Sequence, residues 1–376
     1  MSQTDYELNG GAGGEATTAP ALAWRPPRPK AYRPRIGLVG CGGITKHHLA
    51  AYRGAGYDVV AMTDLQRDRA DARRSEYFPD AEVLDSAAAL FARDDIDVVD
   101  LAPHPAHRAP LLEQAIDAGK HVLSQKPFVT DLDFGERLVA RAEQRGLKLA
   151  VNQNGRWAPH VSYMRQAIAA GLVGEVTSVD TAVHWNHNWV KGTPFDNIPH
   201  LVLYDFAVHW FDMLHCYTGG RPARRLHADV GPAAGQTARP PLLAQVQVSF
   251  EQAQASMQFR AAACHGASDR TVIVGTKGML VSTGPNLNEQ QVTLCTEAGT
   301  AVAELDGQWF DTGFDGTMSE LACAIEEDRE PANAGRDNLA SLALCFAAMG
   351  SAERGQPVEV GSVRRIEPGW LDDAEA

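Results

Sequence analysis

The sequence has few of the features that mark secreted, membrane or nucleic-acid-binding proteins. Six cysteines occur in 376 residues and no two form a C-x-x-C pair, which favours reduced thiols in a cytoplasmic protein. No apolar run approaches the length of a membrane span, and the N-terminus lacks the charged-then-apolar pattern of a signal peptide. Lys and Arg number 34 against 47 Asp and Glu. The resulting charge of -13 argues against nucleic acid as a partner.

The chain is long enough for two domains, and 44% hydrophobic with 22% charged residues is typical of a globular protein. Residues 1–32 are rich in Gly, Ala, Pro and Thr, which predicts a disordered tail. Over residues 33–151, short apolar runs alternate with helix-like stretches, which predicts a doubly wound parallel sheet. Over residues 152–376, several stretches have period-two alternation, which predicts an α/β domain with a large, mostly antiparallel or mixed sheet.

A glycine-rich segment, RIGLVGCGGITKHH, lies between the first predicted strand and helix. Gly40, Gly42 and Gly43 would let the backbone turn tightly and approach a pyrophosphate. The helix start at Ile44 offers free N–H groups and a positive dipole end. The third glycine position of the dinucleotide motif is Thr45, so a tight turn without a ligand is the alternative.

Asp64 ends the second predicted strand, 24 positions after Gly40. A carboxylate at this position can accept hydrogen bonds from the ribose hydroxyls of NAD, and it would repel the extra phosphate of NADP. Together with the glycine loop, Asp64 predicts a Rossmann dinucleotide-binding domain that prefers NAD. Arg67 leaves binding of NADP open as the weaker alternative.

The segment YDFAVHWFD, residues 204–212, carries three ionisable side chains in an apolar context. On a regular helix, Asp205, His209 and Asp212 would share one narrow stripe. A buried polar stripe must either be fully hydrogen-bonded or face a polar cavity. The pattern alone leaves a structural pair and a catalytic pair equally open.

Three segments in this order after the glycine loop resemble the Gfo/Idh/MocA family of nicotinamide-dependent oxidoreductases. They are LAPHPAH (101–107), AGKHVLSQKP (118–127) and YDFAVHWFD, and the resemblance covers about residues 35–365. It implies a Rossmann domain followed by an α/β domain whose open sheet contacts other subunits in a homodimer or homotetramer. It also implies sugars, inositols or related polyols as substrates.

The resemblance also implies roles for individual residues. Lys126 is the lysine of the family's E-K-P motif, and Asp205 and His209 match its D-x-x-x-H pair. Pro103 and His104 fall in the segment beneath the nicotinamide. The glutamate of E-K-P is Gln125 here. Gln125 can still hydrogen-bond the cofactor, but it removes a negative charge beside Lys126.

Alcohol oxidation requires a base for the hydroxyl proton while the cofactor accepts the hydride. We expect His209 to be this general base, because the ordinary pKa of histidine lies near working pH. Asp205, one helical turn earlier, would fix the imidazole tautomer. Lys126 would hold the substrate oxygen across the interdomain cleft.

A second polar segment, VHWNHNWV (183–190), places His184 and Asn186 on one face if it is a strand. The family often draws substrate contacts from this strand, whereas a subunit interface is the structural alternative. We expect no metal, because the H-x-x-H pairs at 104–107 and 184–187 lack the spacing and the glutamate of zinc hydrolases.

Three functions compete on this sequence. The first is an NAD-dependent dehydrogenase that acts on a sugar or cyclic polyol. The second is an NAD-dependent glycoside hydrolase or lyase that oxidises the sugar transiently. The third is a cofactor-binding protein without catalysis, which need not retain both Lys126 and His209.

Overall fold

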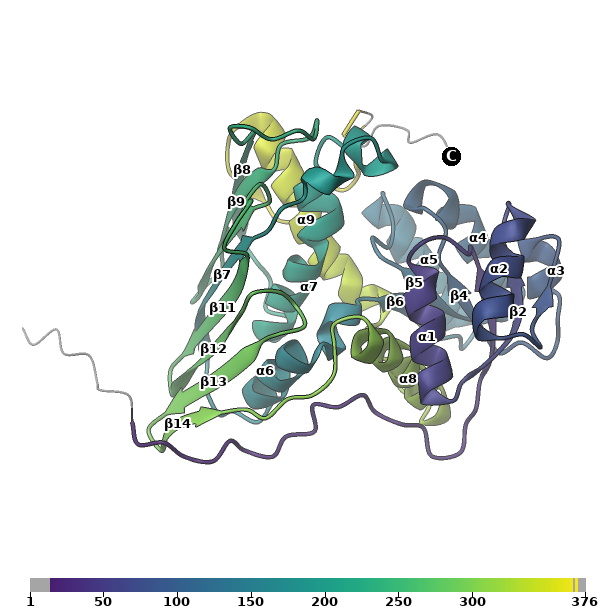
Figure 1. The fold of residues 1–376 in the computed structure, drawn as a ribbon, viewed down its shortest axis with the longest axis horizontal. Helices are drawn as coiled ribbons and strands as arrows, with labels where there is room; N and C mark the ends of the chain where they lie inside the picture. Colours follow the sequence, from purple (N-terminus) through teal and green to yellow (C-terminus); the bar gives the residue numbers. More distant parts are fainter. Residues whose placement is uncertain (1–13, 368, 371–376) are drawn as a thin grey trace, which may run out of the picture.

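The computed structural model describes residues 14–367, 369 and 370, and it has two lobes, each built on one β-sheet (Figure 1). Among these residues, no helix combines the length and the apolar character needed to cross a bilayer. The two lobes meet along the helices that lie between the sheets (Figure 1).

The first sheet has six parallel strands in the order β3-β2-β1-β4-β5-β6. Both of its faces are covered by helices, which explains why its strands are near-continuous apolar runs. The strands are β1 (Arg35–Val39), β2 (Asp58–Thr63), β3 (Glu82–Val83), β4 (Val98–Leu101), β5 (His121–Gln125) and β6 (Leu149–Asn152). This arrangement confirms the predicted doubly wound parallel sheet.

The helices of this lobe alternate with its strands. They are α1 (Thr45–Ala55), α2 (Arg67–Tyr77), α3 (Ala87–Phe91), α4 (Pro105–Asp117) and α5 (Leu132–Gln144). Helix α8 (Asp311–Glu326), from the C-terminal part of the chain, also packs here. Its Met318 and Leu321 share a buried cluster with Ile36 and Leu38 of β1. A boundary at residue 151 therefore separates α8 from the sheet that it covers.

The second sheet has nine strands in the order β14-β13-β12-β11-β7-β10-β9-β8-β15. Only β7 and β10 pair in parallel among these neighbours, which confirms the predicted mixed, mostly antiparallel sheet. The strands are β7 (Val176–His184), β8 (Arg225–Gly231), β9 (Leu243–Ser249), β10 (Gln254–Arg260), β11 (Ser268–Gly275), β12 (Gly278–Gly284), β13 (Gln291–Thr296), β14 (Gly299–Val302) and β15 (Val358–Glu359).

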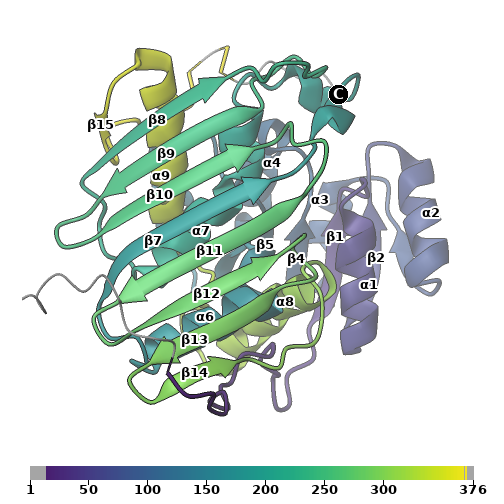
Figure 2. The same cartoon turned by 60° about the vertical axis from the view of Figure 1, so that its left-hand side comes forward.

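Helices α6 (Pro159–Ala169), α7 (Val208–Tyr217) and α9 (Gly335–Arg354) lie against one face of this sheet. Figure 2 looks onto its opposite face. Along β10, exposed or half-buried residues alternate with buried ones, as expected for a strand with one face on the core. The catalytic candidates lie on the helix side, between this sheet and the first lobe.

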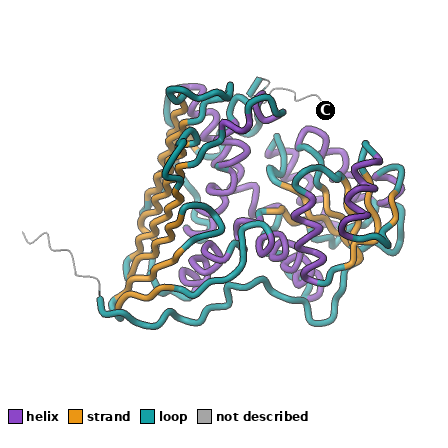
Figure 3. The backbone as a smooth tube through the Cα atoms, viewed as in Figure 1, coloured by secondary structure: helices purple, strands orange, loops and turns teal. Residues whose placement is uncertain are grey.

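Residues 14–32 differ from the predicted disordered tail. This segment, drawn as loop in Figure 3, runs past the lower ends of both lobes from β14 to β1. Trp24 is buried, and its carbonyl accepts a 2.6 Å hydrogen bond from the Ser162 hydroxyl. Arg28 forms a salt bridge with Asp315 of α8. One aromatic anchor and specific polar contacts outweigh the tail-like composition, and residues 1–13 lie outside the described part.

Candidate active site

The catalytic candidates line one cavity of about 420 Å³ between the two lobes. It lies at the carboxyl ends of β4 and β5, the edge at which open parallel sheets bind ligands. Lys126 and His209 face it from different lobes. Most of the remaining wall is aromatic or aliphatic, and it includes Trp185, Trp189, Phe195, Phe206, Trp210 and Trp309.

Lys126 follows directly on β5 and reaches across to the second lobe. Its ammonium donates to the backbone oxygen of Asp205 at 2.9 Å and to the Asp205 carboxylate at 3.0 Å. Both side chains are about one-fifth exposed, at 17% and 20%. The pair is therefore partly shielded from water, where an ion pair is stronger than on the surface.

Asp205 does not take the position that a regular helix over 204–212 predicts. Residues Val202–Phe206 form a π-helical turn, and regular α-helix begins only at Val208. The wider turn changes the angular spacing between Asp205 and His209. Asp205 thus pairs with Lys126. We expected it to fix the tautomer of His209, but the imidazole Nδ1 has no hydrogen-bond partner among the described residues.

His209 lies in the first turn of α7 and is partly exposed to the cavity. Its ring meets the edge of Trp309 at 5.5 Å between centroids. Burial places its pKa well below the ordinary value, and the positive charge of Lys126 lowers it further. His209 is therefore neutral near pH 7, which is the form that can accept a proton.

Asp212, the third ionisable residue of the predicted stripe, has a structural role. Its two carboxylate oxygens each accept a 2.6 Å hydrogen bond from Arg156. Both side chains are only 2% exposed, and Ser341 also donates to Asp212 at 3.0 Å. Two of the three residues of the polar stripe thus face the cavity, and the third anchors a buried arginine.

Gln125 connects Lys126 to a buried polar chain that sequence reasoning missed. Its Oε1 accepts the backbone N–H of Lys126 at 2.6 Å, and its Nε2 lies 3.0 Å from Nε2 of His48. An amide nitrogen can only donate, so His48 Nε2 accepts and the His48 proton lies on Nδ1. His48 Nδ1 then donates to Asp100 at 2.7 Å. In the sequence, the carboxylate of Asp100 within the apolar run VVDL of β4 indicates a buried polar group that needs partners.

The glycine loop after β1 has the shape that a dinucleotide needs. Gly40 has φ = +85°, and a Cβ there would lie 3.0 Å from the backbone nitrogen of Pro103. A Cβ on Gly42 or Gly43 would meet nothing within 4 Å, so open space lies over the loop. Space at the start of α1 is what a pyrophosphate would fill.

The residues expected around the cofactor surround this loop. Asp64 lies at the end of β2 and accepts hydrogen bonds from the backbone N–H of Cys41 at 2.6 Å and of Gln66 at 2.8 Å. These bonds hold its carboxylate beside the glycine loop. Ile44, Pro103 and His104 line the same cavity as Lys126. The residues present therefore fit a bound nicotinamide dinucleotide.

His184 and Asn186, which we expected to contact substrate, lie outside the cavity lining. His184 Nδ1 lies 3.2 Å from the Ser268 hydroxyl, and Asn186 Oδ1 accepts the backbone N–H of Asn188 at 3.1 Å. Val183 of β7 is buried against the helices and shares a side with Trp185, so His184 lies on the other face of the strand. Trp185 and Trp189 line the cavity instead.

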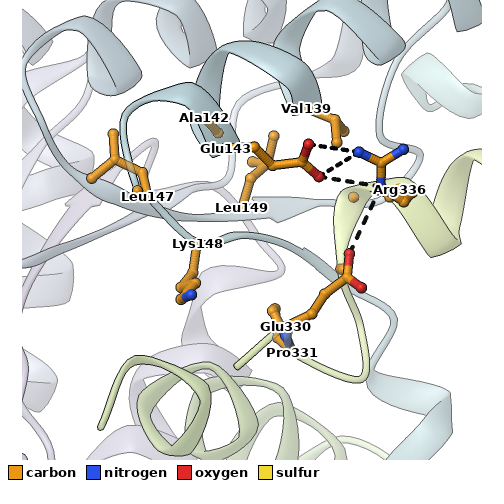
Figure 4. A pocket seen from close by; sticks show the side chains of 12 residues that line it. Val139, Ala142, Glu143, Leu147, Lys148, Leu149, Glu330, Pro331 and Arg336 are labelled. Carbon is orange, nitrogen blue, oxygen red and sulfur yellow. Dashed lines mark hydrogen bonds and ion pairs between the residues drawn. The ribbon is translucent and has the colours of Figure 1, made fainter. Parts of the chain in front are cut away.

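A second cavity of about 260 Å³ shares no residue with the first. It lies between α5 and the start of α9 (Figure 4). Arg336 forms a fork of hydrogen bonds to Glu143, including one of 2.6 Å, and lies 4.0 Å from Glu330. Because Arg336 pairs with Glu143 and Lys148 pairs with Asp328, this cavity offers no comparable set of acid and base groups.

Two family profiles match the chain. The profile described as "Oxidoreductase family, NAD-binding Rossmann fold" matches residues 34–153, and the "GFO/IDH/MocA C-terminal domain" matches residues 161–281. A D-apiose dehydrogenase of Paraburkholderia graminis is 27% identical over 88% of this chain and 91% of its own length. An inositol 2-dehydrogenase of Rhizobium meliloti is 26% identical over 87% and 99%. A crystal structure of an oxidoreductase from Agrobacterium radiobacter, in complex with NAD+, L-tartaric acid and magnesium, shares the fold with a TM-score of 0.78, at 20% identity over 88% of this chain and 99% of that one.

Proposed function

Because this chain belongs to the Gfo/Idh/MocA family of NAD(P)-dependent oxidoreductases, we propose that it transfers a hydride between a hydroxyl-bearing carbon of a sugar or cyclic polyol and NAD. The observation that carries the proposal is the meeting of Lys126 and His209 in one cavity beside the glycine loop. The relatives that act on D-apiose and inositol support a hydroxylated substrate.

Each catalytic residue has one task in this reaction. The nicotinamide ring, when bound, accepts or returns the hydride. Neutral His209 accepts the proton of the substrate hydroxyl. Lys126 orients the hydroxyl oxygen and stabilises the negative charge that develops on it. Asp205 holds the Lys126 ammonium in place through the 3.0 Å ion pair.

We propose NAD rather than NADP as the cofactor. The Asp64 carboxylate is held at the end of β2 by two backbone N–H groups. A fixed negative charge there favours ribose hydroxyls and repels a 2′-phosphate. Asp64 therefore acts both as a ligand and as an electrostatic filter.

The test is to incubate the purified protein with NAD+ or NADP+ and a panel of sugars, inositols and their glycosides. The expected result is formation of NADH with at least one member of the panel and a lower KM for NAD+ than for NADP+. Glycoside cleavage without net NADH would favour the redox-assisted hydrolase or lyase instead. Tight NAD+ binding with no reaction across the panel would leave a cofactor-binding protein.

A further inference from the structure

The cavity walls indicate which part of a substrate this site can recognise. Resting on the function proposed above, we propose that the substrate is a glycoside with an aromatic aglycone, whose sugar lies at Lys126 and His209 and whose aglycone stacks at the cavity mouth. Three features of the cavity support this: its aromatic wall, its rim, and the small number of polar groups that remain for a ligand.

The wall is built from aromatic side chains that come from separate parts of the chain. Four of the seven tryptophans line this single cavity. Trp185 contacts Trp210 with ring centroids 5.5 Å apart, and Trp210 stacks on Trp309 at 6.3 Å. The last of these rings meets His209. A continuous series of aromatic contacts therefore joins His209 to Trp185.

Two further aromatic rings form the rim. Trp189 and Phe195 lie on the short 3₁₀ turns Asn188–Val190 and Pro194–Asn197, 5.9 Å apart and nearly perpendicular. They are 56% and 36% exposed, whereas Trp210 and Trp309 are buried. Large exposed aromatic side chains beside a binding cavity provide a stacking surface for an apolar group.

Most polar groups of the lining already have partners within the protein. The Arg108 guanidinium donates to the carbonyl oxygens of Pro103 and Pro127, and Asn154 Nδ2 donates to the Trp309 carbonyl. Gln125 uses its amide for Lys126 and His48. Hydrogen-bonding capacity toward a ligand thus remains at Lys126, Asp205 and His209, together with the Tyr204 hydroxyl and Trp185 Nε1, which have no partner among the described residues.

This distribution disfavours a free cyclic polyol as the preferred substrate. Such a ligand carries hydroxyls around its whole ring, and the aromatic wall offers them few partners, of which the unpaired Nε1 of Trp185 is one. A glycoside places hydroxyls at one end and an apolar group at the other. That polarity matches a cavity whose lining combines the ionisable groups Lys126, Asp205 and His209 with the exposed rings of Trp189 and Phe195.

The experiment compares methyl and phenyl glycosides of the same sugars, together with the free sugars and myo-inositol. We expect kcat/KM with NAD+ to be at least about tenfold higher for a phenyl glycoside than for its methyl counterpart, since stacking adds apolar contact. Calorimetric titration of the NADH-bound protein with each glycoside measures its Kd, so the phenyl-to-methyl preference can also be tested as a ratio of binding constants, independently of turnover.

Variants locate the effect. Trp189→Ala and Phe195→Ala should each reduce the phenyl-to-methyl ratio toward one while the Kd of NADH stays unchanged. Val302→Ala, which truncates a 48% exposed apolar residue on β14, is the matched control and should leave the ratio intact.

Other outcomes would overturn the inference. Equal values for methyl and phenyl glycosides, or a preference for a free sugar or inositol, would overturn it while the dehydrogenase function stands. If Trp189→Ala lowers the mass measured by sedimentation but leaves the phenyl-to-methyl ratio unchanged, Trp189 forms a subunit contact and not a substrate contact. Phenyl-selective binding without any oxidation would support the inference and overturn the proposed function.

Discussion

The Lys126 ammonium lies 3.0 Å from the carboxylate of Asp205 and 2.9 Å from its backbone oxygen. Lys126 follows strand β5 of the first lobe, and Asp205 lies in the π-helical turn before α7 of the second. One side chain is therefore held by two acceptors on the opposite lobe. The position of Lys126 relative to His209 depends on this contact.

Asp205→Asn tests this dependence. The amide keeps the shape of the side chain but removes the charge that holds the ammonium, so we expect kcat/KM to fall about 10- to 100-fold with little change in the Kd of NADH. A double-mutant cycle with Lys126→Met measures the coupling. If the fold losses of kcat/KM in the two single variants simply multiply in the double variant, the two residues act independently.

His209→Asn removes the proposed base. We expect kcat to fall roughly 10²- to 10⁴-fold, the usual contribution of a general base, while NADH affinity remains within about threefold of the parent. Because His209 is neutral well below pH 6.5, the parent enzyme should show no loss of kcat/KM from this residue between pH 6 and 8. Near-parental turnover of the asparagine variant would remove His209 from the mechanism.

Gln125→Glu tests the proton position in the buried chain. A carboxylate cannot donate, so His48 would have to donate from Nε2 while its Nδ1 still donates to Asp100. We expect the imidazole ¹⁵N chemical shifts of His48 to show a protonated Nδ1 in the parent and a protonated Nε2 in Gln125→Glu, with kcat/KM within about tenfold of the parent. Gln125→Leu, which removes both contacts, is the disruptive control. An unprotonated Nδ1 of His48 in the parent would contradict the assigned tautomer.

Asp64→Ala tests cofactor choice. Losing the carboxylate should weaken NAD+ binding about 10-fold, because the ribose hydroxyls lose an acceptor. The preference of the protein for NAD+ over NADP+ should also become smaller, because the repulsion of the 2′-phosphate disappears. The Kd values of NAD+ and NADP+ are measured by titrating each cofactor without substrate. Asp68→Ala, which removes an exposed carboxylate from the first turn of α2, is the control. Unchanged affinity for both cofactors in Asp64→Ala would exclude Asp64 from the binding site.

The two sheets could be predicted because the burial of each strand determines its pattern of apolar residues. Strands such as β4 and β6, buried on both faces, are short, mostly apolar runs with one polar residue each, Asp100 and Asn152. The glycine loop has a spacing that few other structures require. In the second sheet, one covered face produces alternation along β9 and β10. Both signals are local, so a single sequence is enough to read them.

The site could be predicted only as a set of residues, because its geometry depends on non-local contacts. Periodicity assumes a regular helix, and it cannot show that Val202–Phe206 widens into a π turn that directs Asp205 to Lys126. Alternation along β7 likewise separates His184 and Asn186 from Val183 and Trp185, but the pattern alone cannot show that the Val183 side is the one that faces the helices. The bonds that join His48 to Gln125 span 77 residues and leave no local pattern.

Buried histidines should make the folded state less stable in mild acid. Burial lowers the pKa of His160 to about 3 and that of His187 to about 4, and a histidine in the unfolded chain has a pKa of about 6.5. As pH falls below 6.5, these two histidines become protonated in the unfolded chain but stay neutral in the folded state. Each therefore reduces the free energy of unfolding by up to about 1.4 kcal/mol per pH unit until its folded pKa is reached.

Asp269 acts in the opposite direction over part of the same range. Burial raises its pKa to about 7, so the folded state holds a proton that the unfolded chain has released above about pH 4, and stability falls as pH rises toward 7. Urea unfolding at pH 7 and pH 5 separates the two effects. His160→Phe, which keeps an aromatic ring beside Trp309, should lose less stability on acidification than the parent. Asp269→Asn should lose more, and identical pH dependence in all three proteins would contradict both assignments.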